Sequence, residues 1–136
     1  YKSGGATFRI FPIFPATPLY SPEEVESFEV GAKFEKDGYR LNIAAYAMDY
    51  ENIQVEIFTN IAPVIKNGGE GEVKGLELEA FLPLPGNLFV EASFSYTDAE
   101  YTSIDPGATQ INLASKFPMT PETQASLSIS KVFSLG

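Results

Sequence analysis

The stretch Leu88-Phe89-Val90-Glu91-Ala92-Ser93-Phe94-Ser95-Tyr96-Thr97-Asp98 shows the pattern that decides the fold. Apolar or aromatic residues occupy the even positions up to Tyr96, and after Phe89 the odd positions between them are polar. Successive side chains of a β-strand point to opposite faces, so a period of two separates the two sets. The aromatic and β-branched content also favours a strand. The sequence therefore predicts an amphipathic strand over residues 88–98.

Three further stretches alternate in the same way, at residues 25–34 (from Ser27 onward), 73–82 and 123–133. A fifth, Leu41 to Phe58, is longer and less regular, and exceeds the usual strand length of roughly five or six residues. We expect it to be one long strand with a bulge near Ala44–Ala45, and its alternation does not assign an inward face. The chain is predicted to be all-β, with about five strands.

The expected connections alternate between short and long. Lys36-Asp37-Gly38-Tyr39 predicts a tight hairpin, because Asp-Gly accommodates positive φ, and Pro83-Leu84-Pro85-Gly86-Asn87 predicts another short turn. The links Thr59–Glu72 and Tyr101–Pro121 are longer, and Tyr1–Glu24 reads as an irregular, Pro-rich segment. An antiparallel up-and-down meander with one plain rim and one elaborated rim is the plan of an outer-membrane barrel.

Composition excludes several functions. The 136 residues carry a net charge of -9, with no Cys, His or Trp. The acidic balance argues against a nucleic-acid surface, and the absence of Cys and His removes the common transition-metal ligands and the usual general base. No run approaches the ~18 apolar residues of a membrane-spanning helix, whereas spanning β-strands need only ~9–11. Because Tyr1 is not an initiator Met and an alternating stretch runs close to Gly136, we expect a piece of a longer chain.

Alternation alone leaves two environments open for the apolar face. It can meet lipid around a polar lumen, or pack inside a soluble sandwich or barrel. Lys131 shares a face of the last strand with the apolar residues Leu127 and Ile129. It lies close to the turn end, where a long cationic side chain can snorkel to the membrane interface. Aromatic residues fall near both ends of the strands and predict paired interfacial girdles. The girdle residues are Phe34, Tyr39, Phe81, Phe89 and Phe133 at the short-turn ends, and Phe28, Tyr50, Phe94, Tyr96, Tyr101 and Phe117 at the long-loop ends.

An ordered set of motifs covers nearly the whole chain. They are Lys2-Ser3-Gly4-Gly5, Pro22-Glu23-Glu24-Val25-Glu26-Ser27-Phe28-Glu29-Val30-Gly31-Ala32-Lys33, Asp37-Gly38-Tyr39-Arg40-Leu41, Ala44-Ala45-Tyr46, Asp49-Tyr50-Glu51-Asn52-Ile53-Gln54, Asn67-Gly68-Gly69, Gly75-Leu76-Glu77-Leu78-Glu79, Ser95-Tyr96-Thr97-Asp98-Ala99-Glu100-Tyr101 and Phe117-Pro118-Met119-Thr120-Pro121. In order and spacing the set resembles the β-barrel domain of TonB-dependent receptors. Tyr39 is an extra residue relative to the D-G-R-L hairpin of that family.

The resemblance implies that residues 1–136 are part of a transmembrane β-barrel of the ~22-stranded outer-membrane receptor type, without the plug domain and without a TonB box. It implies the outer membrane of a Gram-negative bacterium, with lipid around the barrel. In the intact protein it implies a plug domain, TonB and a small scarce ligand: a ferric siderophore, haem, cobalamin or a glycan. The expected function is energy-coupled uptake, not catalysis. The alternatives are a passive porin-like barrel and a soluble β-rich carbohydrate-binding or adhesin module.

Four groups of residues are candidate sites, and each has a plainer interpretation. Residues 69–75 (GEGEVKG) match no phosphate-loop spacing and are expected to be a flexible strand entry. Glu77 and Glu79 share a strand face, where lumen solvation explains them, and Asp98, Glu100 and Asp105 lack calcium-loop spacing. Aromatic residues that could stack on a ligand are Tyr50, Tyr101, Phe8, Phe11 and Phe14, which girdle or loop packing also explains. We therefore predict no catalytic, metal or cofactor residues and assign no ligand contacts.

Overall fold

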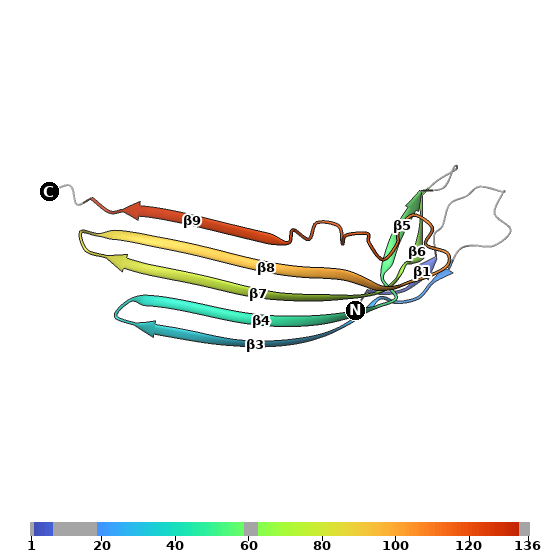
Figure 1. Ribbon diagram of the computed structural model, residues 1–136, viewed down its shortest axis with the longest axis horizontal. Helices are drawn as coiled ribbons and strands as arrows, with labels where there is room; N and C mark the ends of the chain where they lie inside the picture. The colour runs from blue at the N-terminus through green and yellow to red at the C-terminus, as the bar shows by residue number, and fades with distance from the viewer. Residues whose placement is uncertain (1, 7–18, 59–62, 134–136) are drawn as a thin grey trace. The chain divides into compact units, whose positions relative to one another are not determined.

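The computed structural model describes residues 2–6, 19–58 and 63–133. Those residues form nine strands: β1 Gly5–Ala6, β2 Leu19–Tyr20, β3 Glu24–Lys36, β4 Tyr39–Glu51, β5 Gln54–Phe58, β6 Pro63–Asn67, β7 Gly69–Leu84, β8 Leu88–Ile104 and β9 Thr123–Lys131. Five of them form one sheet in the order β3-β4-β7-β8-β9, and neighbouring strands run in opposite directions (Figure 1). The predicted antiparallel meander is confirmed. β3 and β9 are the edges of this sheet, so closure into a barrel is not seen.

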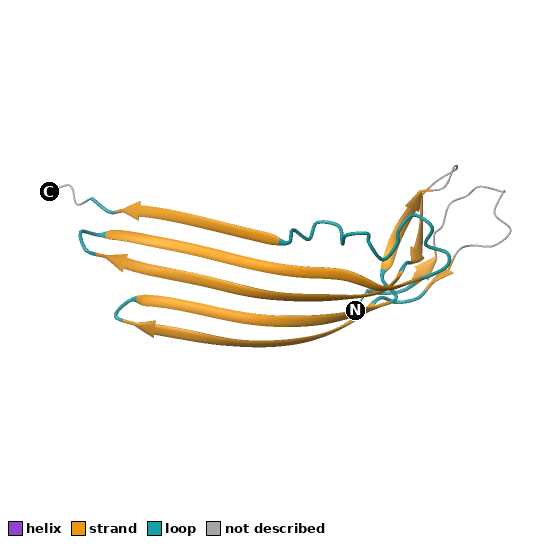
Figure 2. Cartoon of the chain, viewed as in Figure 1, coloured by secondary structure: helices purple, strands orange, loops and turns teal. Residues whose placement is uncertain are grey.

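Two short turns join the strand pairs, as predicted (Figure 2). Asp37 and Gly38 have φ of 52° and 83°, and Gly86 and Asn87 have φ of 80° and 56°. Asp37-Gly38 is a two-residue loop, in which positive φ at both residues matches the twist of the flanking strands. The loop between β7 and β8 has three residues, Pro85 to Asn87. Gly, Asp and Asn tolerate positive φ best. These residue types therefore fix both hairpins locally.

The longer segments differ from the sequence predictions. The single strand expected over Leu41–Phe58 is wrong, because the chain turns at Asn52 (φ 55°) and separates β4 from β5. β5 pairs with β6 in a two-stranded sheet of its own, so the link Thr59–Glu72 contains a strand and the start of β7. The segment Tyr101–Pro121 begins with the end of β8. The N-terminal segment carries β1, β2 and an antiparallel bridge between Lys2 and Glu23.

The chain divides into two compact units. Unit 1 comprises residues 1–27, 48–73 and 99–118, and unit 2 comprises residues 28–47, 74–98 and 119–136. Every buried hydrophobic side chain among the described residues belongs to unit 1. Its core cluster consists of Ile57, Val64 and Ala108, with Val55, Ile104 and Ile111 packed against it. Unit 1 thus has a small hydrophobic core of its own.

Unit 2, taken by itself, is a single-layer sheet with two different faces. The register of β8 and β9 pairs Val90 with Ile129 and Ala92 with Leu127 on one face, and Glu91 with Ser128 on the other. The apolar face is bare: Leu127 is 69% exposed, Phe28 72% and Leu76 43%. No second sheet encloses these side chains in the described part of unit 2. A closed dry centre, which the soluble-sandwich alternative requires, is therefore absent from this unit.

The contacts of β4 assign the face that the sequence left open. The amide of Asn42 donates to Glu79, and the hydroxyl of Tyr46 lies 3.0 Å from that of Thr97, so the even-numbered residues share the polar face. Tyr46 lies against Gly75, and Asn42 against Glu79, so both contacts fit one pairing register. A bulge would shift the register by one residue between them. The expected bulge at Ala44–Ala45 is therefore wrong.

Candidate functional site

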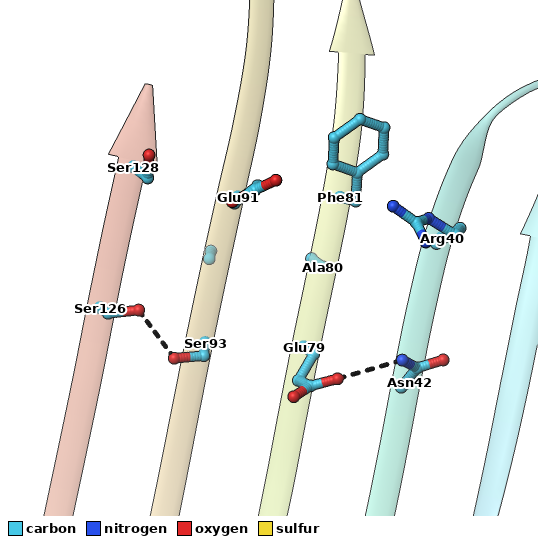
Figure 3. Close-up of a pocket in the computed structure, with 10 residues that line it drawn as sticks. Arg40, Asn42, Glu79, Ala80, Phe81, Glu91, Ser93, Ser126 and Ser128 are labelled. Carbon is cyan, nitrogen blue, oxygen red and sulfur yellow. Dashed lines mark hydrogen bonds between the residues drawn. The ribbon is translucent and has the colours of Figure 1, made fainter. Parts of the chain in front are cut away.

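The polar face of unit 2 carries hydrogen-bonding side chains on four neighbouring strands, β4, β7, β8 and β9. The Asn42 side-chain amide donates to Glu79 Oε2 at 3.1 Å, and the Ser93 and Ser126 hydroxyls lie 2.8 Å apart (Figure 3). These side chains line an open groove of about 310 Å³. Glu77, which sequence analysis paired with Glu79, lines the two adjoining grooves on this face. The arrangement offers hydroxyls, amides and carboxylates to water or a polar surface.

The short-turn end of this polar face carries an aromatic stack. The Arg40 guanidinium carbon lies 4.7 Å from the centre of the Phe81 ring (Figure 3). Phe81 stacks on Phe89, with the ring centres 5.9 Å apart. Phe81 shares its face with Glu79, and Phe89 shares its face with Glu91. The girdle prediction is therefore wrong for Phe81 and Phe89, because they lie on the polar side. Phe34 and Tyr39 alternate in step with the apolar residues of their strands, so they lie on the apolar face, as a girdle requires. Phe133, just past the end of β9, continues the same alternation.

Tyr50, Tyr101 and Phe117 form an aromatic cluster in unit 1. Tyr101 is 6% exposed and its ring lies 4.6 Å from that of Phe117, which also contacts Tyr50 edge-on at 6.1 Å. Gly71 leaves the room for Phe117, because a Cβ there would lie 2.5 Å from the ring. Burial raises the pKa of Tyr101, and the charge of Glu23 adds to this. The structure places Tyr50 and Tyr101 in packing contacts, and Phe8, Phe11 and Phe14 lie outside the described residues.

Unit 1 contains a cluster of polar residues, here called the anchoring node, that joins motif residues far apart in the sequence. It consists of Lys2, Ser3, Ser21, Glu23, Asn52, Gln54 and Asn67. Gln54 is at its centre: the backbone N–H donates to Glu23 Oε2 at 2.7 Å, and the side-chain amide donates to Ser3 O and Ser21 O at 3.0 and 3.2 Å. Lys2 Nζ lies 3.9 Å from the same Glu23 carboxylate. The node therefore ties the N-terminal segment to β5.

Asn67 completes the node from the end of β6. Its Oδ1 accepts from Ser21 N at 2.7 Å, and its Nδ2 donates to Ser21 O and Asn52 O at 3.2 and 2.8 Å. A side-chain amide suits this position because it offers a donor and an acceptor together. The sequence motifs contained Gln54 and Asn67, but no role was assigned to either residue, because their partners lie about 30 or more residues away in most cases.

The structure also places the remaining sequence candidates. Residues 69–75 belong to β7, so the expectation of a flexible entry is wrong, and the Gly-rich segment forms no phosphate loop. Asp98 and Glu100 lie within β8, whereas Asp105 is in the turn after it, with its N–H donating to Gly68 O at 2.9 Å. Within residues 2–6, 19–58 and 63–133, no three acidic side chains come together as a metal-binding group. Gln110, which sequence analysis did not consider, bonds both backbone groups of Phe58.

The fold and its faces define a class of protein. A single-layer antiparallel meander with one bare apolar face, one polar face and short turns is the wall of an outer-membrane type of β-barrel. No helix in the part of the chain that the structure describes is long and apolar enough to cross a membrane.

Comparison with known proteins gives the family. Residues 3–134 match the family model described as "TonB dependent receptor-like, beta-barrel", and the chain belongs to this family. Its members are transporters of the Gram-negative outer membrane and are not enzymes. Relatives include the ferrioxamine B receptors of Salmonella typhimurium strains SL1344 and LT2, each 32% identical over 90 residues. The match covers 65% of this chain and 12% of each receptor, so the chain spans only a small part of the length of these relatives.

Proposed function

We propose that this chain is a wall segment of an outer-membrane receptor that takes up a small, scarce ligand with energy from TonB. The ligand class that we favour is a ferric siderophore. The relatives named as ferrioxamine B receptors support this choice, at 32% identity. Family membership over residues 3–134 supports the transport role.

The lengths of the strands in unit 2 support a membrane-spanning role. Its strand segments are residues 28–36, 39–47, 74–84, 88–98 and 123–131, each of nine to eleven residues. Tilted transmembrane strands need about 9–11 residues to cross the hydrocarbon core. The observation that carries the proposal is the bare apolar face with Leu127 at the middle of β9, since lipid is the solvent that suits such a face.

The partner proposals follow from the sheet and the family. β3 and β9 have free edges, and an unpaired edge in hydrocarbon is very costly, so we place further strands of a barrel of about 22 strands on both sides. In our proposal all 136 residues belong to this barrel domain. A plug domain elsewhere in the intact receptor occupies the lumen beside the polar face, and TonB acts on that plug.

Unit 1 supports a role at the ligand-receiving rim. The anchoring node, the Gln110 contacts with Phe58 and the cluster around Ile57 hold three long connections in one compact body. Long connections of outer-membrane barrels face the exterior. We propose that unit 1 presents a preformed surface there, so that less ordering is required when the ligand binds.

An uptake assay with the full-length protein that contains this segment tests the proposal. Cells that lack their own siderophore receptors would express it, and uptake of a labelled ferric siderophore would be measured with and without functional TonB. We expect uptake that requires TonB and saturates with ligand. Unchanged uptake without TonB would support the passive porin-like alternative. Recovery of the protein in the soluble fraction, without detergent, would support the carbohydrate-binding or adhesin alternative.

A further inference from the structure

The charges of the apolar face in unit 2 are distributed unevenly. The charged strand residues with apolar parity in the described part of unit 2 are Lys36 on β3 and Lys131 on β9, both at the short-turn rim, and Lys74 on β7 and Asp98 on β8, both at the opposite end of the unit. The glutamates of the same strand segments, Glu29, Glu35, Glu77, Glu79 and Glu91, have the opposite parity. In a chain of net charge -9, the short-turn rim of this face therefore carries two cations and no strand anion, whereas Lys74 and Asp98 balance each other at the opposite end.

An apolar groove lies beside Lys36 at this rim. It measures about 430 Å³, and the side chains that line it on this face include Phe34, Tyr39, Leu41, Ala80 and Leu82. The two-residue turn places Lys36 opposite Tyr39, and Phe34 opposite Leu41. The small Ala80 lies between the larger Leu78 and Leu82 on the same face of β7 and leaves the space open. Phe34 is 59% exposed, and no side chain in the described part of unit 2 fills the groove.

We propose that this groove binds one acyl chain of an anionic glycerophospholipid of the periplasmic leaflet, with the lipid phosphate at the Lys36 ammonium. Three observations favour this occupant. The groove lies on the lipid-facing side, the short-turn rim of an outer-membrane barrel faces the periplasm, and the cation at its mouth complements a phosphate. Tyr39 fits the same depth, because its ring is apolar and its hydroxyl is polar. The inference rests on the proposed membrane placement of unit 2.

Photocrosslinking tests the site directly. The full-length receptor that contains this segment would be reconstituted in nanodiscs with phosphatidylglycerol that carries a diazirine in one acyl chain. We expect adducts on peptides that contain residues 34–41 and 80–82. Ala80→Phe fills the groove and should lower these adducts roughly tenfold, the effect of lost contact with about two methylene groups. Ala125→Phe, the same substitution on the same face of β9, should leave them unchanged.

A second variant tests the contact with the lipid headgroup. Lys36→Gln should reduce labelling by the phosphatidylglycerol probe but not by a phosphatidylcholine probe with the same acyl chain, since the latter has no net charge. Equal labelling of Ala80→Phe and the wild type, adducts spread evenly around the barrel, or a crosslink at this groove to another protein would each overturn the lipid site. Siderophore uptake by the same variants separates the two proposals: retained uptake with no labelling overturns this site alone, and loss of outer-membrane localisation overturns the proposed function.

Discussion

The hydroxyls of Tyr46 and Thr97 lie 3.0 Å apart although their strands, β4 and β8, are not neighbours in the sheet. The Tyr46 ring reaches Thr97 by crossing β7 at Gly75, where a Cβ would collide with the ring carbons and the hydroxyl. Gly75 thus makes room for a side chain that links three strands on the polar face. An aromatic ring that covers a strand glycine is a known means of holding register.

Gly75→Ala should destabilise the full-length receptor by about 1–3 kcal/mol, because the added methyl group has no room beneath the Tyr46 ring. Tyr46→Phe keeps the ring and loses only the hydrogen bond, so it should cost about 0.5–1.5 kcal/mol. Urea unfolding in detergent measures both. In a Tyr46→Ala background the Gly75→Ala substitution should cost much less, and equal costs in the two backgrounds would disprove the contact.

Gln54→Ala should loosen the N-terminal segment, because the side-chain amide holds Ser3 O and Ser21 O. We expect hydrogen exchange at the amides of Lys2, Ser21 and Glu23 to accelerate about tenfold, the effect of losing side-chain hydrogen bonds worth roughly 1.4 kcal/mol together. Mass spectrometry of peptides from the full-length receptor measures the exchange at these amides. Gln124→Ala, at an exposed position on β9, is the control and should leave them unchanged. Equal exchange in the two variants would contradict the role given to the anchoring node.

The regular part of this fold could be predicted from the sequence because its cause is local. In β8 and β9 the period of two decides which side chains share a face, and the observed pairing of Ala92 with Leu127 follows from it. Asp37-Gly38 likewise determines its own turn. The break at Asn52 was missed because alternation continues on both sides of it. Asn is among the residues that adopt positive φ most readily, so the residue type was the available signal.

The candidate site could be predicted less well, because it depends on pairing between distant segments. Gln54, Glu23 and Lys2 stood in separate motifs, and only the bridge between Lys2 and Glu23 and the turn before β5 bring them together. Phe81 and Phe89 were assigned to a girdle by their distance from the turn alone. Phe81 lies two residues from Glu79 and Phe89 two residues from Glu91, so the alternation of the strands would have placed both rings on the polar face.

Leu127→Arg and Ser128→Arg form a matched pair at the centre of β9. The first places a charge on the apolar face and should cost about 2–4 kcal/mol if that face meets the bilayer midplane. The second places the same charge on the polar face and should have little effect. The free energy of unfolding of the full-length receptor in lipid vesicles measures both. Equal costs, or a larger cost for Ser128→Arg, would count against the assignment of the two faces.

The isolated 136-residue chain should aggregate in aqueous buffer and accumulate as inclusion bodies. In the described part of unit 2 no hydrophobic side chain is buried, Leu127 and Phe28 are largely exposed, and both sheet edges are free to pair with other chains. Expression without an export signal, followed by sedimentation, checks this. A monomer that unfolds in plain buffer in one sharp, cooperative transition would show that the apolar face is covered in water.

The central claim, that one face of this sheet meets lipid and the other water, is tested most directly by spin labels along β9. The segment contains no cysteine, so single cysteines at positions 124–129 of a full-length receptor free of other reactive cysteines can each carry one label. Accessibility to oxygen and to a water-soluble nickel chelate would be measured in lipid vesicles. The account predicts that labels at 125, 127 and 129 are more accessible to oxygen and that labels at 124, 126 and 128 are more accessible to the chelate. Uniform accessibility, or the opposite alternation, would contradict it.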